Sequence, residues 1–179
     1  MGILIPVLPF HLSNQGVGIA ATSLVLGAAG GGAIGGAVLA GALTHRLGQG
    51  RVAVVSLLLM GVAVASMGFT GSVGLLVGLQ LLVGVAAIGV MLSRHTHLTS
   101  SVAIGLRGRA MALMGGSMRF SFLLGPAVGG VLVDLVGFRS TFLVAGAAAA
   151  LGCFGMLPEL RTPPSTTMEV AGGSGFGLL

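Results

Sequence analysis

Long apolar runs separated by short polar connections make up most of this 179-residue sequence. A helix that crosses a bilayer needs about 20 apolar residues, and five runs come close to or exceed that length. The stretch 3–12 is too short to cross and contains Pro6 and Pro9, so it predicts a partial first helix. We expect an all-α, polytopic transmembrane helical bundle. Its full spans are predicted at 17–43, 52–69, 73–93, 110–136 and 138–157.

The arginines between the runs predict the orientation of the helices. If the connection 11–16 faces outward, alternation places six arginines on the cytoplasmic side and Arg139 outside, while Arg119 falls inside a run. Basic residues are enriched in cytoplasmic loops, so this distribution indicates a multi-pass protein of the cell (inner or plasma) membrane. The six cytoplasmic positions are Arg46, Arg51, Arg94, Arg107, Arg109 and Arg161.

Composition excludes most soluble classes of protein. Hydrophobic residues make up 55% of the chain and charged residues 6%, against about 25% charged in an ordinary soluble domain. Cys153 stands alone, which excludes a disulfide scaffold. The net charge of +5 comes from arginines scattered between apolar runs, so we expect the lipid bilayer as a partner and no nucleic acid. After Pro158 the sequence is rich in Pro, Ser, Thr and Gly, which predicts a disordered cytoplasmic tail over 159–179.

Several short motifs do not fit their surroundings. The glycine string at 30–35 lacks the strand and the nearby acidic residue of a dinucleotide site. Ser174, in a string similar to that of intramembrane serine proteases, lies in the predicted tail. His45, His95 and His97 have no carboxylate or thiol close in sequence, whereas a metal site needs three or four convergent ligands. We therefore expect no cofactor, no metal and no enzymatic activity.

The predicted span 110–136 carries charge at two points. Arg119 lies about 15 Å along it, and burying a guanidinium in lipid costs at least about 2.5 kcal/mol. Two alternatives remain open for this residue: it faces a polar cavity and an anionic substrate or coupling group, or it snorkels toward the cytoplasmic arginines. Asp134 and Arg139 flank Gly137, which predicts a solvated ion pair at the outer turn.

Small residues recur four apart in the run 17–43 and predict two smooth strips on one helix. Such strips are typical of close helix packing, and they also fit a surface along which helices slide during a conformational cycle. One row comprises Gly27, Gly31 and Gly35, and the neighbouring row comprises Gly32, Gly36 and Ala40.

Four strings, in register over residues 6–158, resemble signatures of the major facilitator superfamily. The segment 41–51 is similar to the loop signature between the second and third helices of that family, with matches at Gly41, Leu43, Arg46 and Gly48. The segment 125–130 (Gly-Pro-Ala-Val-Gly-Gly) is similar to the Gly-Pro-x-x-Gly-Gly signature of its drug–proton antiporters. The segment 107–110 resembles the start of that helix, and 6–9 resembles the end of the first helix.

The resemblance implies the N-terminal half of a twelve-helix transporter, in which two halves rock about a midplane site. Our substrate or coupling candidates are Arg119, as a charge in the cavity, and Gln80, as a polar group that faces it. Pro126 lacks an N–H and should bend its helix, so a kinked interface is expected at Gly125, Pro126, Gly129 and Gly130. A cytoplasmic latch loop is expected from Gly41, His45, Arg46, Gly48 and Arg51.

Three positions depart from the family pattern. His45 replaces an Asp of the loop signature, and Gln49 replaces a usual Arg. Gln80 stands where the family often places a buried Arg that is linked to proton coupling. We therefore predict that any proton coupling in this chain does not use that position.

The expected function is transmembrane transport, as a fragment of a proton-coupled drug or small-solute efflux transporter. Its partners in the full-length transporter would be a small-molecule substrate, protons and a C-terminal half. Because the second half and part of the first helix are missing, we expect no transport by this chain alone. Two alternatives stay open: a sugar or metabolite carrier fragment, and a non-transporting membrane-interaction subunit that pairs through its glycine strips.

Overall fold

Helices account for almost all of the described structure. The computed structural model describes residue 2 and residues 4–155, and no strand occurs among them. A short 3₁₀ turn at Ile104–Leu106 precedes the last helix. The expected all-α bundle is therefore confirmed. The helices are α1 (Leu4–Asn14), α2 (Ile19–Leu47), α3 (Gln49–Met67), α4 (Val73–Ser101) and α5 (Arg107–Leu151).

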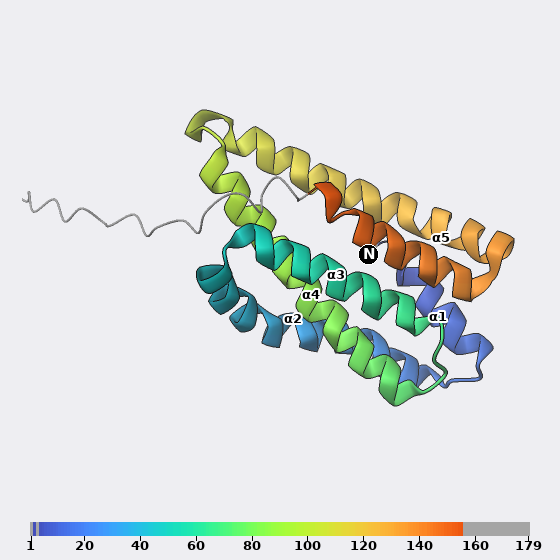
Figure 1. The fold of residues 1–179 in the computed structure, drawn as a ribbon. Helices are drawn as coiled ribbons and strands as arrows, with labels where there is room; N and C mark the ends of the chain where they lie inside the picture. The colour runs from blue at the N-terminus through green and yellow to red at the C-terminus, as the bar shows by residue number, and fades with distance from the viewer. Residues whose placement is uncertain (1, 3, 156–179) are drawn as a thin grey trace, which may run out of the picture.

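Four of the described helices, α2 to α5, are long and apolar enough to cross a membrane. Helices suit lipid because every backbone N–H and C=O in their interior is satisfied within the segment. With 11 residues, α1 rises only about 17 Å, well short of a hydrocarbon core of about 30 Å. It packs beside α5 without matching its length (Figure 1).

The 45 residues of α5 form two helical segments that join at Gly137. The backbone there has φ 78° and ψ 169°, a left-handed conformation that glycine adopts without a steric penalty. The predicted runs 110–136 and 138–157 lie on either side of this break, although residues 156 and 157 are outside the described part of the chain. The predicted tail 159–179 is also outside it.

The two ends of the bundle carry different connections and different residues. The α1–α2 link, the α3–α4 link and the break at Gly137 lie together at one end, which we call the Gly137 end (Figure 1). The α2–α3 junction and the α4–α5 link lie at the opposite end, which carries Arg46, Arg51, Arg107 and Arg109 and which we call the arginine end. The helices therefore alternate in direction, as the apolar runs predict.

One of the two small-residue rows on α2 forms its contact with α4. A Cβ at Gly32 would lie 2.8 Å from the carbonyl carbon of Leu81, and a Cβ at Gly36 would lie 2.7 Å from the Cα of Val85. Both distances are shorter than a side-chain carbon tolerates, so the two backbones touch. Gly27 and Gly35 of the other row face open space.

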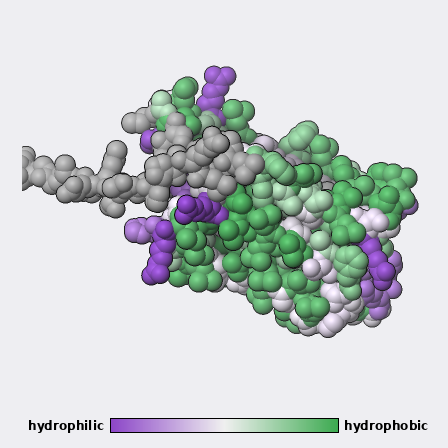
Figure 2. Space-filling view, in the orientation of Figure 1, coloured by the Kyte–Doolittle hydropathy of each residue, from purple (hydrophilic) through white to green (hydrophobic). Residues whose placement is uncertain are grey.

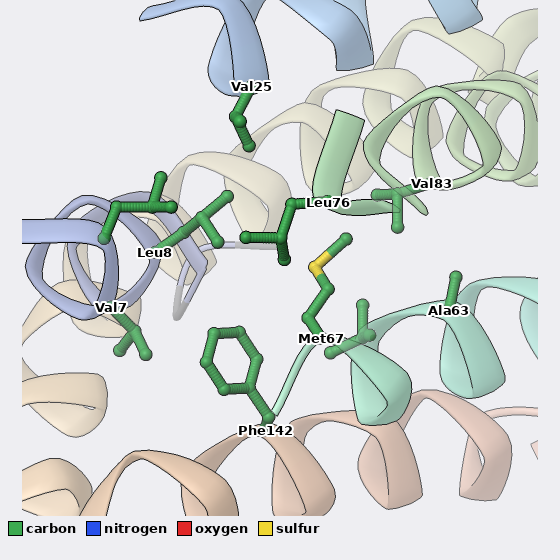
Figure 3. Close-up of a cluster of buried hydrophobic side chains, with 10 residues drawn as sticks. Val7, Leu8, Val25, Ala63, Met67, Leu76, Val83 and Phe142 are labelled. Atoms are coloured by element: carbon green, nitrogen blue, oxygen red, sulfur yellow. The ribbon is translucent and has the colours of Figure 1, made fainter. Parts of the chain in front are cut away.

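The main hydrophobic core lies toward the Gly137 end and draws on all five helices. Figure 3 shows its side chains pointing toward a common centre, with the Phe142 ring from α5 among them. Burying such side chains against each other replaces lipid contacts with fixed, close-packed ones. The buried members are Val7, Leu8, Leu12, Val25, Ala63, Val64, Met67, Leu76, Val83 and Phe142. A smaller cluster toward the arginine end contains Ala53, Leu57, Val90 and Cys153.

Large apolar side chains cover the sides of the bundle. In Figure 2 the hydrophobic residues occupy the middle of the visible face, and the hydrophilic ones gather at its two ends. Exposure is high even for the largest aliphatic groups: Ile34 is 78% exposed, Leu135 76% and Leu123 73%. Contiguous apolar surface of this extent suits a lipid environment rather than water.

Candidate functional site

The expected latch residues lie at the α2–α3 junction, but they do not form a loop. Gly48 is the one residue between α2 and α3, and its φ of 84° makes the turn. Helical backbone hydrogen bonds carry α2 past the end of the apolar run. The last of them runs from the N–H of Gly48 to the Thr44 carbonyl, at 3.1 Å. The prediction of a loop is therefore wrong. Gly41, His45 and Arg46 occupy the last turns of α2, and Arg51 the first turn of α3, all of them exposed.

The expected kinked interface lies in the first segment of α5. Gly125 and Gly129 are buried on one face, whereas Gly130 is exposed and faces open space. A Cβ at Gly2 would lie 3.1 Å from the Cα of Gly125, so Gly2 packs closely on this face. The backbone at Pro126 keeps helical angles, and the sharp break in α5 is at Gly137 instead. Proline removes one backbone hydrogen bond, but the φ that its ring fixes is also a helical value, so the helix can continue through Pro126.

Gln80 is a polar side chain in the apolar part of α4. It is 5% exposed and shares a helix face with the core residues Leu76 and Val83. No hydrogen bond from the described residues reaches its amide. The fully buried side-chain atom without a hydrogen-bond partner among the described residues is instead Ser93 Oγ, farther along α4, and such an atom costs roughly 1–3 kcal/mol.

Arg119 lies in a different environment from Gln80. Its side chain is exposed on α5, and it has no hydrogen bond or ion pair with any described residue. It is about 18 Å along the helix from Arg107 at the arginine end, whereas Gln80 is about 10 Å along α4 from the Gly137 end. The two residues are therefore not brought into one site within this chain.

The structure also brings together polar residues that the sequence reasoning missed. At the Gly137 end, His11 of α1 and Gln15, just after α1, meet the α3–α4 link and the second segment of α5. The available signal was the spacing of four between His11 and Gln15 and between Phe138 and Phe142, since residues four apart share a helix face. The predicted ion pair between Asp134 and Arg139 is not formed in the described structure.

No group of three or more His, Cys, Asp or Glu side chains close enough to hold a metal ion occurs within residues 2 and 4–155. What the described residues do provide is a set of membrane-length helices with close glycine contacts and isolated polar groups. The profile of the Major Facilitator Superfamily matches residues 1–175. The chain belongs to this family.

Two relatives of this major facilitator chain are a multidrug resistance protein and a probable transporter by name. It is 28% identical to multidrug resistance protein 1 of Bacillus subtilis over 173 residues, which cover 91% of the chain and 42% of that protein. It is 30% identical to the probable sulfoacetate transporter SauU of Cupriavidus necator over 112 residues, which cover 63% of the chain and 26% of that protein. The major facilitator chain thus spans less than half the length of either relative. Its family and its apolar helices make it a multi-pass membrane protein.

Proposed function

We propose that this chain supplies the first six-helix unit of an alternating-access transporter and acts together with a second unit. The observation that carries the proposal is the family match over residues 1–175 of a chain whose described part holds four membrane-length helices. In this mechanism two helical units enclose a site near the bilayer midplane and rock against each other. Exposed faces on α2 and on the first segment of α5 are then surfaces for the second unit or for lipid.

Drug or small-solute efflux driven by protons is the finer form of the proposal. It is supported by the match to multidrug resistance protein 1 over 91% of the chain and by the Gly-Pro string at 125–130. The second candidate is a carrier of a small organic anion, favoured by the match to the probable sulfoacetate transporter. A guanidinium binds sulfonate and carboxylate groups well, so Arg119 would serve the second substrate class directly.

Each candidate residue then has a defined role. Gln80 supplies an uncharged polar group to the substrate path, because its buried amide is unused by the described residues. Arg119 supplies the positive charge that faces the second unit or the substrate. Gly125 and Gly129 allow close backbone contact on α5. The exposed latch residues at the α2–α3 junction contact the second unit at the cytoplasmic face, which is the arginine end in a cell membrane.

Reconstitution into liposomes tests the transport proposal. The chain is purified and studied alone, and it is also fused to the part of the Bacillus relative that it does not match. We expect saturable, pH-gradient-driven flux of ethidium from the fusion and none from the chain alone. Competition by sulfoacetate, with no flux of ethidium, would select the anion carrier instead. A correctly inserted fusion that moves neither compound, beside an active intact relative, would contradict the proposal, and so would saturable flux by the chain alone.

Variants of the fusion separate proton coupling from substrate binding. We expect Gln80→Ala to change the substrate affinity while leaving the proton dependence intact, with Leu82→Ala, at an exposed position of the same helix, as its matched control. Gradient-driven flux that disappears in Gln80→Ala but survives in Arg119→Ala would place coupling at the α4 position and contradict our prediction.

The alternative of a membrane-interaction subunit depends on the small-residue row that does not face α4. Gly27 and Gly35 have open space above them, so another helix could approach α2 closely there. Detergent-resistant oligomers of the chain that disappear in Gly31→Leu, with no flux in any preparation, would favour this function.

A further inference from the structure

His11 is held in a cluster of residues from three separate segments at the Gly137 end. Its ring centroid lies 5.4 Å from that of Phe138 and 5.5 Å from that of Phe142, both in the second segment of α5. The ring meets the two phenylalanines at interplanar angles of 52° and 73°. With 9% of its surface exposed, the imidazole is enclosed between α1 and α5.

Two hydrogen bonds fix the imidazole within this cluster. The Nε2 atom of His11 and the Nε2 atom of Gln15 are 2.9 Å apart. The ring also donates a hydrogen bond to the backbone of Thr70 in the α3–α4 link. A neutral imidazole has one donor and one acceptor, which suits one bond to a carbonyl and one from an amide N–H. A charged ring has two donors, so the Gln15 amide would have to turn its oxygen toward it.

Gln15 ties the imidazole to the α3–α4 link while its own side chain remains exposed. Its side-chain oxygen lies toward Gly71, where a Cβ would be only 3.3 Å from it. The α3–α4 link is in turn packed against α5: a Cβ at Gly68 would lie 3.3 Å from the Arg139 carbonyl oxygen and 3.1 Å from the Phe142 Cβ. A change at His11 is therefore transmitted to both the link and α5.

Burial lowers the pKa of His11 most and the charge of Arg139 lowers it further, whereas the hydrogen bond with the Thr70 backbone acts in the opposite direction. Arg139 on α5 interacts unfavourably with a charged imidazole, and no ion pair with Asp134 neutralises this arginine among the described residues. Asp134, exposed on the other side of Gly137, is the acidic group of the same helix. The end of α3, the α3–α4 link and the first turns of α4 contain no titratable residue. Within residues 2 and 4–155, no acidic side chain that packs on the ring offers it a counter-ion.

We propose that His11 is a proton-binding site that controls the packing of α1 against α5 and the α3–α4 link at the Gly137 end. The neutral ring completes the closed cluster, and a proton opens it. Opening exposes the imidazole, and an exposed histidine titrates at about pH 6.5. The closed form is thus fully stable above that pH and weakens as the pH falls below it. For one proton, the open population rises by up to about 30-fold between pH 8 and pH 5.

Hydrogen–deuterium exchange of the intact chain in detergent tests this proposal. Protection of the amides in 11–16 and 68–72 is measured from pH 8 to pH 5 and corrected for the intrinsic effect of pH on exchange. We expect protection to fall by up to about 30-fold in the unmodified chain and to stay constant in His11→Gln, which keeps an amide but cannot be charged. His45→Gln, at the exposed position near the arginine end, is the matched control and should behave like the unmodified chain.

A second measurement needs no variant. The imidazole nitrogen resonances of His11 in the unmodified chain should show a single neutral tautomer at pH 7, and its protonation should follow the same pH course as the loss of protection. Protection that is independent of pH, an equal loss in His11→Gln, or a charged His11 in the closed form at pH 7 would each overturn the proposal. These outcomes do not depend on whether the chain transports a solute, so they leave the proposed function separately testable.

Discussion

Gly84 of α4 lies against Ala29 of α2 so closely that a Cβ on the glycine would be 2.9 Å from the alanine carbonyl carbon. On the opposite helix, Gly32 and Gly36 meet the backbone of Leu81 and Val85 in the same way. Small residues on both partners therefore create the α2–α4 contact. In lipid, where no hydrophobic force draws helices together, such close packing is a main source of association.

Adding one methyl group at this contact should destabilise the bundle. We expect Gly84→Ala to lower the free energy of unfolding by about 1–3 kcal/mol, because the neighbouring backbone cannot move aside easily. Gly78→Ala is the matched control on the same helix, since its Cβ would meet open space. The control should be neutral, or stabilising by about 0.5–1 kcal/mol through helix propensity. Thermal unfolding in detergent, followed by circular dichroism, measures both, and equal midpoints would contradict the assigned contact.

The change of direction between the two segments of α5 should depend on Gly137, which joins them. Gly137 has φ 78° with nothing within 4 Å of its Cβ position, so the effect of a substitution there is conformational and not steric crowding. We expect Gly137→Ala to cost about 1–3 kcal/mol, because a positive φ combined with a ψ of 169° is a backbone region essentially restricted to glycine. Gly130→Ala, in helical backbone with equal space, provides the comparison. A Gly137→Ala protein as stable as Gly130→Ala would show that the turn does not need this backbone conformation.

Truncating the central aromatic side chain of the core should leave a cavity. Phe142 is fully buried between α1, α3 and α4, so Phe142→Ala is expected to cost about 3–5 kcal/mol. Its neighbour Leu143 is 44% exposed on the outside of α5. Leu143→Ala should have a much smaller effect, because lipid or detergent replaces the lost contacts. The assay is the unfolding midpoint in mixed micelles, and a larger loss at Leu143 would place the core elsewhere.

Cysteine labelling in cells should reveal which end of the bundle faces the cytoplasm. In a Cys153→Ser background, which removes the one native thiol, cysteines replace exposed residues at the two ends. A membrane-impermeant maleimide should label Asn14→Cys in intact cells but should reach Arg46→Cys and Arg109→Cys only in inverted vesicles. Labelling of the two arginine positions from opposite faces would refute the alternating arrangement of the spans.

Much of the fold could be predicted from the sequence because hydropathy and glycine position carry most of the information in a membrane helix. All of the apolar run 17–43 except its first two residues lies in α2, and Gly137 separates the two segments of α5 as the runs on either side indicate. The prediction was wrong where hydropathy changes but helical hydrogen bonding does not. Thr44 and His45 are polar and suggest a loop, yet they continue α2, and α4 likewise extends to Ser101 beyond its apolar run.

Candidate site residues were harder to place than helices. Spacing gave two equivalent glycine rows on α2, and only the position of α4 shows that Gly32 and Gly36 make the contact. Arg119 and Gln80 both stand out in sequence as polar residues within apolar runs, but one is exposed on α5 and the other is buried on α4. Hydropathy reports how polar a residue is and not which neighbour it meets.

The sequence by itself determined that this chain forms apolar helices, where their main connections fall and to which family it belongs. Those properties follow from local chemistry: the length of an apolar run, the backbone freedom of a glycine and the match of short strings. Only the tertiary structure decided that His11 and Gln15 meet Thr70 and Phe142, residues about 60 to 130 positions away in the chain. Such contacts depend on how whole helices pack, and packing is a property of all the surfaces together.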